Sequence, residues 1–97
     1  MMLFGKMIKK LREDQGLLQR QIAYELDIDT PMYSKFERGE RLPKREQIEI
    51  IAKILLCEER ELRVLWLADK ILDKLREDSD VVDDTINEVR KVVSQGH

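Results

Sequence analysis

Residues 19–38, QRQIAYELDIDTPMYSKFER, decide the fold of this chain of 97 residues. They predict a helix over about 19–26, a turn at 27–29 and a second helix over about 30–37. Two helices that cross steeply need a small residue where they touch, and Ala23 holds that place. Apolar residues recur at helical spacing and are expected to face a shared core: Ile22, Leu26, Ile28, Tyr33 and Phe36. The stretch therefore predicts a helix-turn-helix motif.

The second helix of the motif has an outer face that is free to meet a ligand. Opposite its core residues lie Thr30, Pro31, Met32, Ser34 and Lys35. A helix with such a face fits the major groove of duplex DNA, where the base edges can be read. An ordinary helical hairpin that binds nothing fits the same pattern, so the motif by itself leaves both interpretations open.

Helical periodicity continues on both sides of the motif, and the sequence has no strand pattern and no internal repeat. Apolar residues recur at three- and four-residue steps around 4–11, from about 44 to 55, over 59–76 and over 81–94. Gly16 is expected to end the first helix, and Asp80 is expected to cap the last one.

The predicted fold class is all-α, in two parts. Residues 1–78 are expected to form a compact five-helix DNA-binding domain, with the helix-turn-helix at about 19–37. Residues 79–97 are expected to form an appended C-terminal helix that serves dimerisation or packing. The composition agrees, because 39% charged residues, two prolines and four glycines favour ordered helix over disorder.

The formal net charge is −2, but charge is unevenly distributed along the chain. Residues 1–56 carry 11 Lys and Arg against 9 Asp and Glu, whereas residues 57–97 carry 7 against 11. The N-terminal part is therefore suited to face phosphates, while the acidic C-terminal part faces solvent or a partner.

Few residues suited to catalysis or metal binding are present. The single cysteine, Cys57, excludes an internal disulfide and a multi-cysteine zinc site, and we expect it to pack as a small hydrophobic residue. The single histidine, His97, ends the sequence. No apolar run approaches the ~20 residues of a membrane span, and the first residues do not read as a signal peptide. We expect a cytoplasmic protein with no enzyme activity, no metal and no cofactor.

Two stretches, GLLQRQIA at 16–23 and SKFERGERLP at 34–43, resemble the helix 2 to helix 4 signature of Xre-like regulators, the lambda repressor and Cro type. The resemblance covers roughly residues 4–65. It implies a five-helix lambda-repressor-like domain that binds double-stranded DNA. It also implies a homodimer that regulates transcription from an inverted-repeat operator. The turn at 27–29 and the run SKFERGER at 34–41 further resemble regulators encoded beside restriction–modification genes.

The resemblance implies roles for individual residues. It implies that Thr30, Pro31 and Lys35 contact the bases. Lys35 is the strongest of these, because Lys can bond guanine O6 and N7, although a solvated or phosphate-bound Lys fits the position too. Contacts to the DNA backbone are expected from polar and basic residues near the helix ends: Gln19, Arg20, Ser34, Arg38, Arg41 and Lys44. Glu37 is expected to pair with Arg12, which would tie the first helix to the end of the recognition helix.

Three positions depart from the family pattern. Leu18 stands where a Ser, Thr or Asn usually caps helix 2, and losing such a cap costs about 1 kcal/mol. Asp27 stands where the turn usually has Gly, and Asp tolerates left-handed backbone better than most residues. Pro31 disfavours α geometry at the residue before it, so Thr30 is expected to be the N-cap of its helix.

The helix expected over 59–76 is apolar on two sides. One stripe, Leu62, Leu65 and Leu72, is expected to close the core of the domain. The other stripe is expected to form a dimer interface: Val64, Ala68, Ile71 and Leu75. The last helix has a stripe of its own, Val82, Ile86, Val89 and Val93. That helix either joins the dimer seam or folds back over its own chain, and the sequence leaves both open.

A second class of function also fits the acidic C-terminal part. In that interpretation the protein is an antitoxin, which masks a toxin protein and binds DNA to regulate its own operon. A small toxin reading frame beside the gene would distinguish this from a regulator without a protein ligand.

Overall fold

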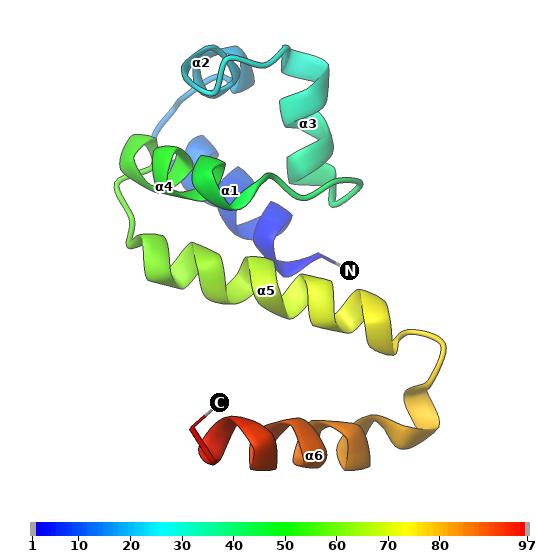
Figure 1. The fold of residues 1–97 in the computed structure, drawn as a ribbon. Helices are drawn as coiled ribbons and strands as arrows, with labels where there is room; N and C mark the ends of the chain where they lie inside the picture. The colour runs from blue at the N-terminus through cyan, green and yellow to red at the C-terminus, as the bar shows by residue number, and fades with distance from the viewer. Residues whose placement is uncertain (1, 97) are drawn as a thin grey trace.

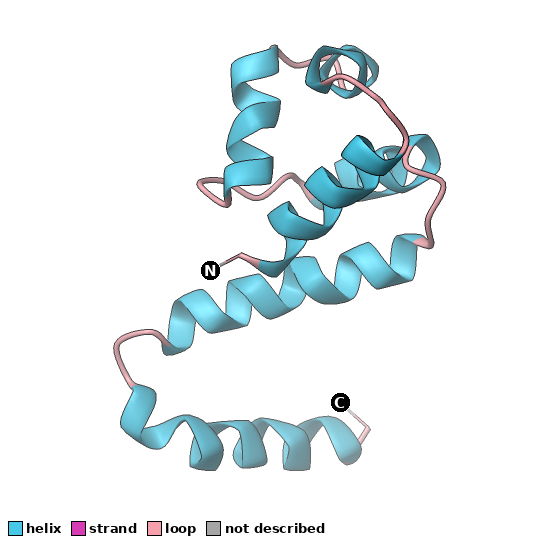
Figure 2. Cartoon of the chain, turned by 180° about the vertical axis from the view of Figure 1, so that it is seen from behind, coloured by secondary structure: helices cyan, strands magenta, loops and turns pink. Residues whose placement is uncertain are grey.

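Helices account for all the regular structure in residues 2–96, the part of the chain that the computed structural model describes. In chain order the elements are α1 (Leu3–Asp14), α2 (Gln19–Glu25), α3 (Thr30–Arg38), α4 (Arg45–Ile54), α5 (Glu59–Leu75), a 3-10 turn η1 (Ser79–Val81) and α6 (Val82–Ser94). The first five helices gather together, and α6 turns back below α5 (Figure 1 and Figure 2). The all-α fold class with an added C-terminal helix is confirmed. His97 lies outside the described residues.

Particular residues end α1 and complete the backbone hydrogen bonding at the starts of α2 and α4. Gly16 follows α1 with a φ of +68°, which agrees with its expected role as a helix terminator. The start of α2 has no capping side chain at Leu18, but the Gln21 side chain accepts a hydrogen bond from the Leu18 N–H at 2.7 Å. The start of α4 repeats this device, with Gln47 accepting from the Lys44 N–H at 2.7 Å. These bonds satisfy a backbone donor that would otherwise be left free at each helix start.

The start of α3 differs from the expectation by one residue. Asp29 is the N-cap, in an extended conformation, and its carboxylate accepts from the Met32 N–H at 2.8 Å. The expectation that Thr30 is the cap was wrong, because Asp29 already supplies the oxygen and Thr30 is the first helical residue. Pro31 is accommodated in the first turn, where its missing N–H has no helical partner in any case. Asp27 has a φ of +57°, so it does adopt the left-handed turn conformation.

One face of each of the first five helices contributes to the hydrophobic core. Its buried hydrophobic residues are Phe4, Ile8, Ile22, Ala23, Leu26, Tyr33, Phe36, Ile48, Ile51, Ala52, Leu55, Leu62 and Trp66. Leu65 packs against this cluster, but Leu72 is 48% exposed, so its expected place in the core was wrong. The core ends near Asp69, where α1 begins, and α5 continues beyond it without a helix to cover that side.

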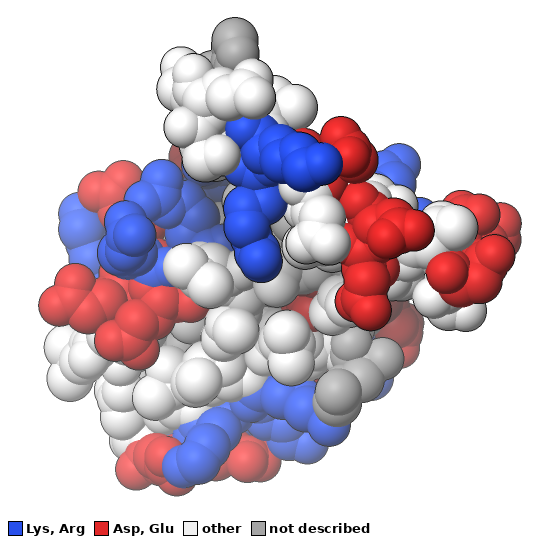
Figure 3. All heavy atoms as spheres, turned by 90° about the horizontal axis from the view of Figure 1, so that it is seen from below, with Lys and Arg blue, Asp and Glu red and all other residues white. Residues whose placement is uncertain are grey.

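The C-terminal helix packs only lightly on the rest of its chain. It runs antiparallel below α5 (Figure 1), and it begins after η1, so Asp80 lies in that 3-10 turn and does not cap α6. No residue of α6 is buried. Val82 and Ile86 are half-buried, whereas Val89 and Val93 are exposed. When the molecule is viewed from below, the side on which α6 lies in Figure 1, much of the middle of the surface is uncharged and charged side chains surround it (Figure 3).

Candidate nucleic-acid interface

Helix α3 is anchored on one face and free on the other. Tyr33 and Phe36 are buried, and their rings meet edge to face with centroids 6.0 Å apart. On the opposite face Pro31 and Lys35 are exposed, and Thr30 is half-buried. The buried rings fix the rotation of α3 about its axis, so the same outer residues always face away from the core.

A network of three polar side chains joins α1, α2 and α3. Arg12 donates from Nε to Glu37 at 2.6 Å and from Nη2 to the same carboxylate at 3.0 Å. Gln19 donates its amide to Glu37 at 2.9 Å, and Arg12 also donates to the Leu17 carbonyl at 3.0 Å. The bidentate ion pair is largely buried, with Arg12 12% and Glu37 2% exposed at the side chain. It therefore holds the end of α3 against the other two helices.

The charge state of this network follows from its surroundings. Burial alone would raise the pKa of Glu37, but the hydrogen bonds from Arg12 and Gln19 outweigh it and hold that pKa below its ordinary value. Burial raises the pKa of the neighbouring Tyr33, and the Glu37 carboxylate raises it further. Glu37 is thus an anion with fixed partners, and the charge of Arg12 offsets its own.

Arg38, at the end of α3, is held by two neighbours. Its Nε donates to Glu40 at 2.6 Å, and its Nη1 donates to the Ser34 hydroxyl. The ion pair is exposed, with side-chain exposures of 52% and 54%, so water and an incoming phosphate compete for it. Arg38 and Ser34, both expected to contact the DNA backbone, therefore form one unit.

The loop that follows α3 is fastened to α5. Trp66 is buried, and its indole N–H donates to the Pro43 carbonyl at 2.8 Å. Arg41 and Lys44, on either side of this bond, are exposed, as is Arg20 in the first turn of α2. The bond sets the position of the basic residues of the loop relative to α5.

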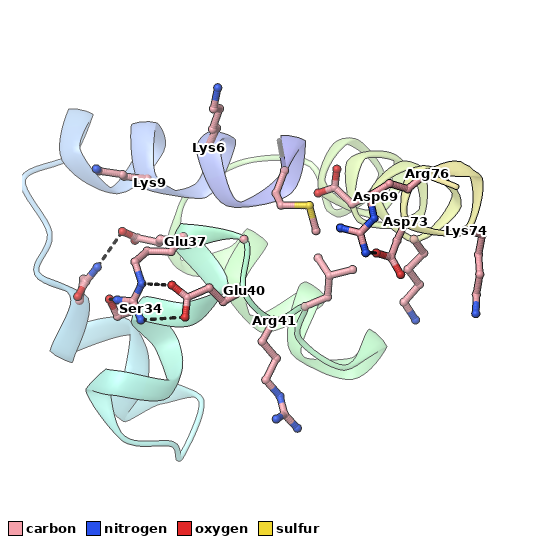
Figure 4. A pocket seen from close by; sticks show the side chains of 16 residues that line it. Lys6, Lys9, Ser34, Glu37, Glu40, Arg41, Asp69, Asp73, Lys74 and Arg76 are labelled. Atoms are coloured by element: carbon pink, nitrogen blue, oxygen red, sulfur yellow. Dashed lines mark hydrogen bonds and ion pairs between the residues drawn. The ribbon is translucent and has the colours of Figure 1, made fainter. Parts of the chain in front are cut away.

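A hollow of about 1150 Å³ opens beside α3, between α1, the loop after α3 and α5 (Figure 4). Basic side chains from all of these elements line it: Lys6, Lys9, Arg38, Arg41, Lys70, Lys74 and Arg76. Its acidic side chains all have partners in the protein: Glu37, Glu40, Asp69 and Asp73. The hollow therefore presents a surplus of positive charge beside α3, which suits an anionic ligand.

Sequence reasoning missed the lysines of this hollow that lie outside the helix-turn-helix. Lys6 and Lys9 are one turn apart on α1, and Lys70 and Lys74 are one turn apart on α5. These spacings are visible in the sequence, but only the fold brings the two pairs to one hollow with Arg41.

Two buried residues that support α1 were also missed. Asp69 is fully buried and accepts from the N–H groups of Leu3 and Phe4 at 2.9 and 2.8 Å. Gly5 is buried where α1 meets the end of α3, and a Cβ there would stand 2.6 Å from the carbonyl oxygens of Phe36 and Glu37. Only glycine permits this approach of the two helices.

The remaining residues predicted for the core and for the dimer interface differ in burial. In the helix-turn-helix, Ile22, Ala23 and Leu26 are buried and Ile28 is half-buried. In the stripe expected to form a dimer interface, Val64 and Ile71 are exposed, whereas Ala68 and Leu75 are half-buried. Cys57 is half-buried and packs against the core, and burial raises the pKa of its thiol.

The described residues lack two kinds of feature, a metal-binding cluster and a membrane-spanning helix. Residues 2–96 contain no group of three or more His, Cys, Asp or Glu side chains placed to hold a metal ion. None of the described helices is long and apolar enough to cross a membrane.

Comparison with known families identifies the helix-turn-helix region. A family model described as "Helix-turn-helix" matches residues 8–62, more than half of the chain, and this region runs from α1 into α5. Neither the curated proteins nor the solved structures gave a significant match. The matched region contains the anchored α3, the Arg12–Glu37 pair and the loop with Arg41. The chain belongs to the helix-turn-helix family of the Xre and lambda-repressor type, whose members bind DNA.

Proposed function

We propose that this protein is a transcriptional regulator that binds a specific duplex DNA sequence as a homodimer in the cytoplasm. The observation that carries the proposal is the arrangement of α3, with one face locked into the core and Lys35 exposed on the other. A helix so fixed inserts the same side chains into the major groove each time it binds. Thr30, Pro31 and Lys35 are the proposed base contacts.

The proposed backbone contacts flank this helix on both sides. One group is at the start of α2, Gln19 and Arg20, and the other is at the end of α3 and after it: Ser34, Arg38, Arg41 and Lys44. The hollow extends the second group toward α1 and α5 with Lys6, Lys9, Lys70 and Lys74. Phosphates are the ligand class that such a basic border fits, and they position the protein without reading sequence.

Two-fold symmetry would give the protein two recognition helices. In dimeric readers of this kind the two helices enter successive major grooves about 34 Å apart, one turn of DNA. We therefore propose an inverted-repeat operator with half-sites at that spacing. In the proposed division of labour, residues 1–78 bind DNA and residues 79–97 contribute to the dimer.

The test is selection of bound duplexes from a random pool, followed by titration of the selected and a scrambled duplex. The proposal expects an enriched inverted repeat that binds at least about 10³-fold more tightly than the scrambled duplex at the same salt concentration. Equal binding to both duplexes would contradict sequence-specific regulation. Lys9→Ala should weaken both complexes, whereas Lys53→Ala, on α4 and outside the hollow, should leave both unchanged.

The regulated genes are a further part of the proposal. The turn at 27–29 supports control of a restriction–modification operon. The antitoxin interpretation is the alternative, and it is favoured by the acidic C-terminal part and the exposed apolar side chains of α6. Finding the selected operator sequence upstream of a restriction–modification operon supports the first interpretation. Finding it upstream of a toxin–antitoxin operon supports the second.

A further inference from the structure

Helix α6 has an apolar stripe that its own chain covers only in part. Val82, Ile86, Val89 and Val93 step by four, three and four residues, which is the spacing of a helix-packing seam. None of the 13 residues of α6 is buried. Helices of this length are marginal in water when they stand alone, and most of their stability comes from packing an amphipathic face. A partner for this stripe is therefore required.

The neighbouring α5 covers only the beginning of that stripe. Val82 and Ile86, near the turn between the two helices, are half-buried, but Val89 and Val93 are 54% and 63% exposed. Because α6 runs antiparallel to α5, its exposed second half lies beside the earlier part of α5 (Figure 1). There Val64 and Leu67 are exposed as well. The α5–α6 pair is therefore open at one end, with apolar side chains on both helices.

The charge pattern of α6 favours a second copy of the same helix as the partner. Asp83 in its first turn and Arg90 near its end flank the stripe on the same side, whereas Asp84 and Lys91 lie on the opposite face, where Lys91 pairs with Glu88 at 3.1 Å. Two copies related by a two-fold axis across their length run antiparallel, so the acidic start of each lies beside the basic end of the other. Self-complementary charge of this kind fits an isologous contact and gives no advantage to a parallel one.

The exposed apolar surface is of the size that a specific dimer uses. On α5, η1 and α6 the large exposed side chains are Val64, Leu67, Ile71, Leu72, Val81, Val89, Val92 and Val93. At about 80 Å² each they offer on the order of 600 Å² per copy, against about 800 Å² per partner in a standard interface. The half-buried residues between them supply part of the difference.

We propose that α6 pairs antiparallel with α6 of a second copy and that the two α5–α6 pairs together form a four-helix dimer interface. The inference rests on the homodimer of the proposed function and assigns its seam to α6 as well as α5. The second copy closes the open end of each α5–α6 pair. Asp83 of each copy then lies beside Arg90 of the other.

The first experiment replaces the exposed half of the stripe in the full chain. Val89→Asp with Val93→Asp places two charges where the second copy packs, and sedimentation at micromolar concentration should change from a dimer to an 11.5 kDa monomer. The matched control, Asn87→Asp with Ser94→Asp, adds the same charge to the same helix away from the stripe and should remain dimeric. Circular dichroism checks that both variants keep their helices. A dimer that survives Val89→Asp with Val93→Asp, or a parent that is already monomeric, overturns the proposal.

The second experiment tests the antiparallel direction by charge exchange. One variant carries Asp83→Lys and the other carries Arg90→Glu, at the two charged positions that flank the stripe. Each should dimerise more weakly by itself than the parent does, and an equal mixture should form a heterodimer in preference to either homodimer. No preference in the mixture overturns the antiparallel α6 pair.

These outcomes are separate from a failure of the proposed function. Sedimentation and charge exchange contain no DNA, whereas the operator selection measures sequence preference directly. A dimer without sequence preference contradicts only the regulator. A sequence-specific dimer that survives Val89→Asp with Val93→Asp contradicts only the α6 seam, and a sequence-specific monomer contradicts both the seam and the proposed homodimer.

Discussion

Asp69 in α5 caps α1, because its carboxylate accepts the Phe4 N–H at 2.8 Å from a position 65 residues further along the chain. It also accepts the Leu3 N–H, and α1 has no side-chain cap of its own at Met2. One buried side chain thus satisfies two backbone donors at a helix start. The first and the fifth helices are held together by this contact.

Asp69→Ala should lower the free energy of unfolding by about 1–3 kcal/mol, because it leaves buried N–H donors without an acceptor. Urea denaturation followed by circular dichroism measures the change. Asp73→Ala is the control, since Asp73 lies one turn further along α5 and is exposed. If both variants unfold at the same urea concentration as the parent, the cap contributes nothing to stability.

The Arg12–Glu37 pair predicts acid sensitivity. The pKa of Glu37 in the folded protein lies below its ordinary value of 4.5, so the unfolded state binds more protons in this range. The stabilisation is fully present above the unfolded pKa and is lost as the pH falls through the folded one. We expect the free energy of unfolding to decline below about pH 4.5, and Glu37→Gln to decline less steeply.

Urea denaturation at a series of pH values provides the measurement, with Glu49→Gln as a control because Glu49 is exposed on α4. The control should keep the slope of the parent. An identical pH dependence in Glu37→Gln and the parent would show that other carboxylates cause the acid sensitivity.

Ala23→Leu should overpack the contact between α2 and α3 and lower the free energy of unfolding by roughly 1–3 kcal/mol. Ala23 is 2% exposed, so an added side chain has no route to solvent. The neighbouring Tyr24 is 82% exposed, and Tyr24→Leu should change stability little. Thermal melts of the two variants make the comparison, and equal melting temperatures would mean that Ala23 does not lie at the helix crossing.

Much of this fold can be predicted from the spacing of apolar residues. Ile22, Leu26, Tyr33 and Phe36 recur at three- and four-residue steps, and that periodicity places α2 and α3 to within one residue of their ends. Periodicity is a local property, so it survives without knowledge of the tertiary structure. Gly16 was predictable from its own backbone preference. The left-handed Asp27 was expected from the family resemblance, whose turn usually has Gly there, together with the tolerance of Asp for that conformation.

What the sequence did not reveal depends on contacts between distant segments. Nothing near Asp69 indicates that the start of α1 will lie beside it, and Gly5 has no local signal of the close approach to α3. At the start of α3 two adjacent residues can each cap a helix, and Asp29 takes the role. Leu56 adopts a φ of +56° after α4 although it is not a residue type that favours this conformation, so no pattern indicated it.

Lys35 and Arg38 should have different effects on DNA binding. Lys35 is exposed on the free face of α3, and Lys35→Ala should reduce the difference between specific and scrambled duplex by ~1–3 kcal/mol. Arg38 lies at the end of the helix, and Arg38→Ala should weaken both complexes alike and flatten the salt dependence by about one unit of slope. Titrations of both duplexes over a salt series separate the two effects.

Glu40 supplies the control for this pair. It holds the Arg38 guanidinium at 2.6 Å in the free protein, so Glu40→Gln should release Arg38 and raise the affinity for both duplexes. If Lys35→Ala leaves the ratio of the two affinities unchanged, Lys35 is a backbone contact and specificity comes from Thr30 or from DNA shape.

Trp66, whose indole N–H donates to the Pro43 carbonyl, can report DNA binding through its own fluorescence. Trp66 is the sole tryptophan, and its ring lies 3.8 Å from the Lys70 ammonium and 5.1 Å from the Arg45 guanidinium. The emission of an indole responds to nearby charge, and Lys70 lines the hollow beside α3 where phosphates are proposed to bind. When DNA draws Lys70 away from the ring or moves the loop at Pro43, the emission should shift, so that binding can be timed by stopped-flow fluorescence on the unlabelled protein.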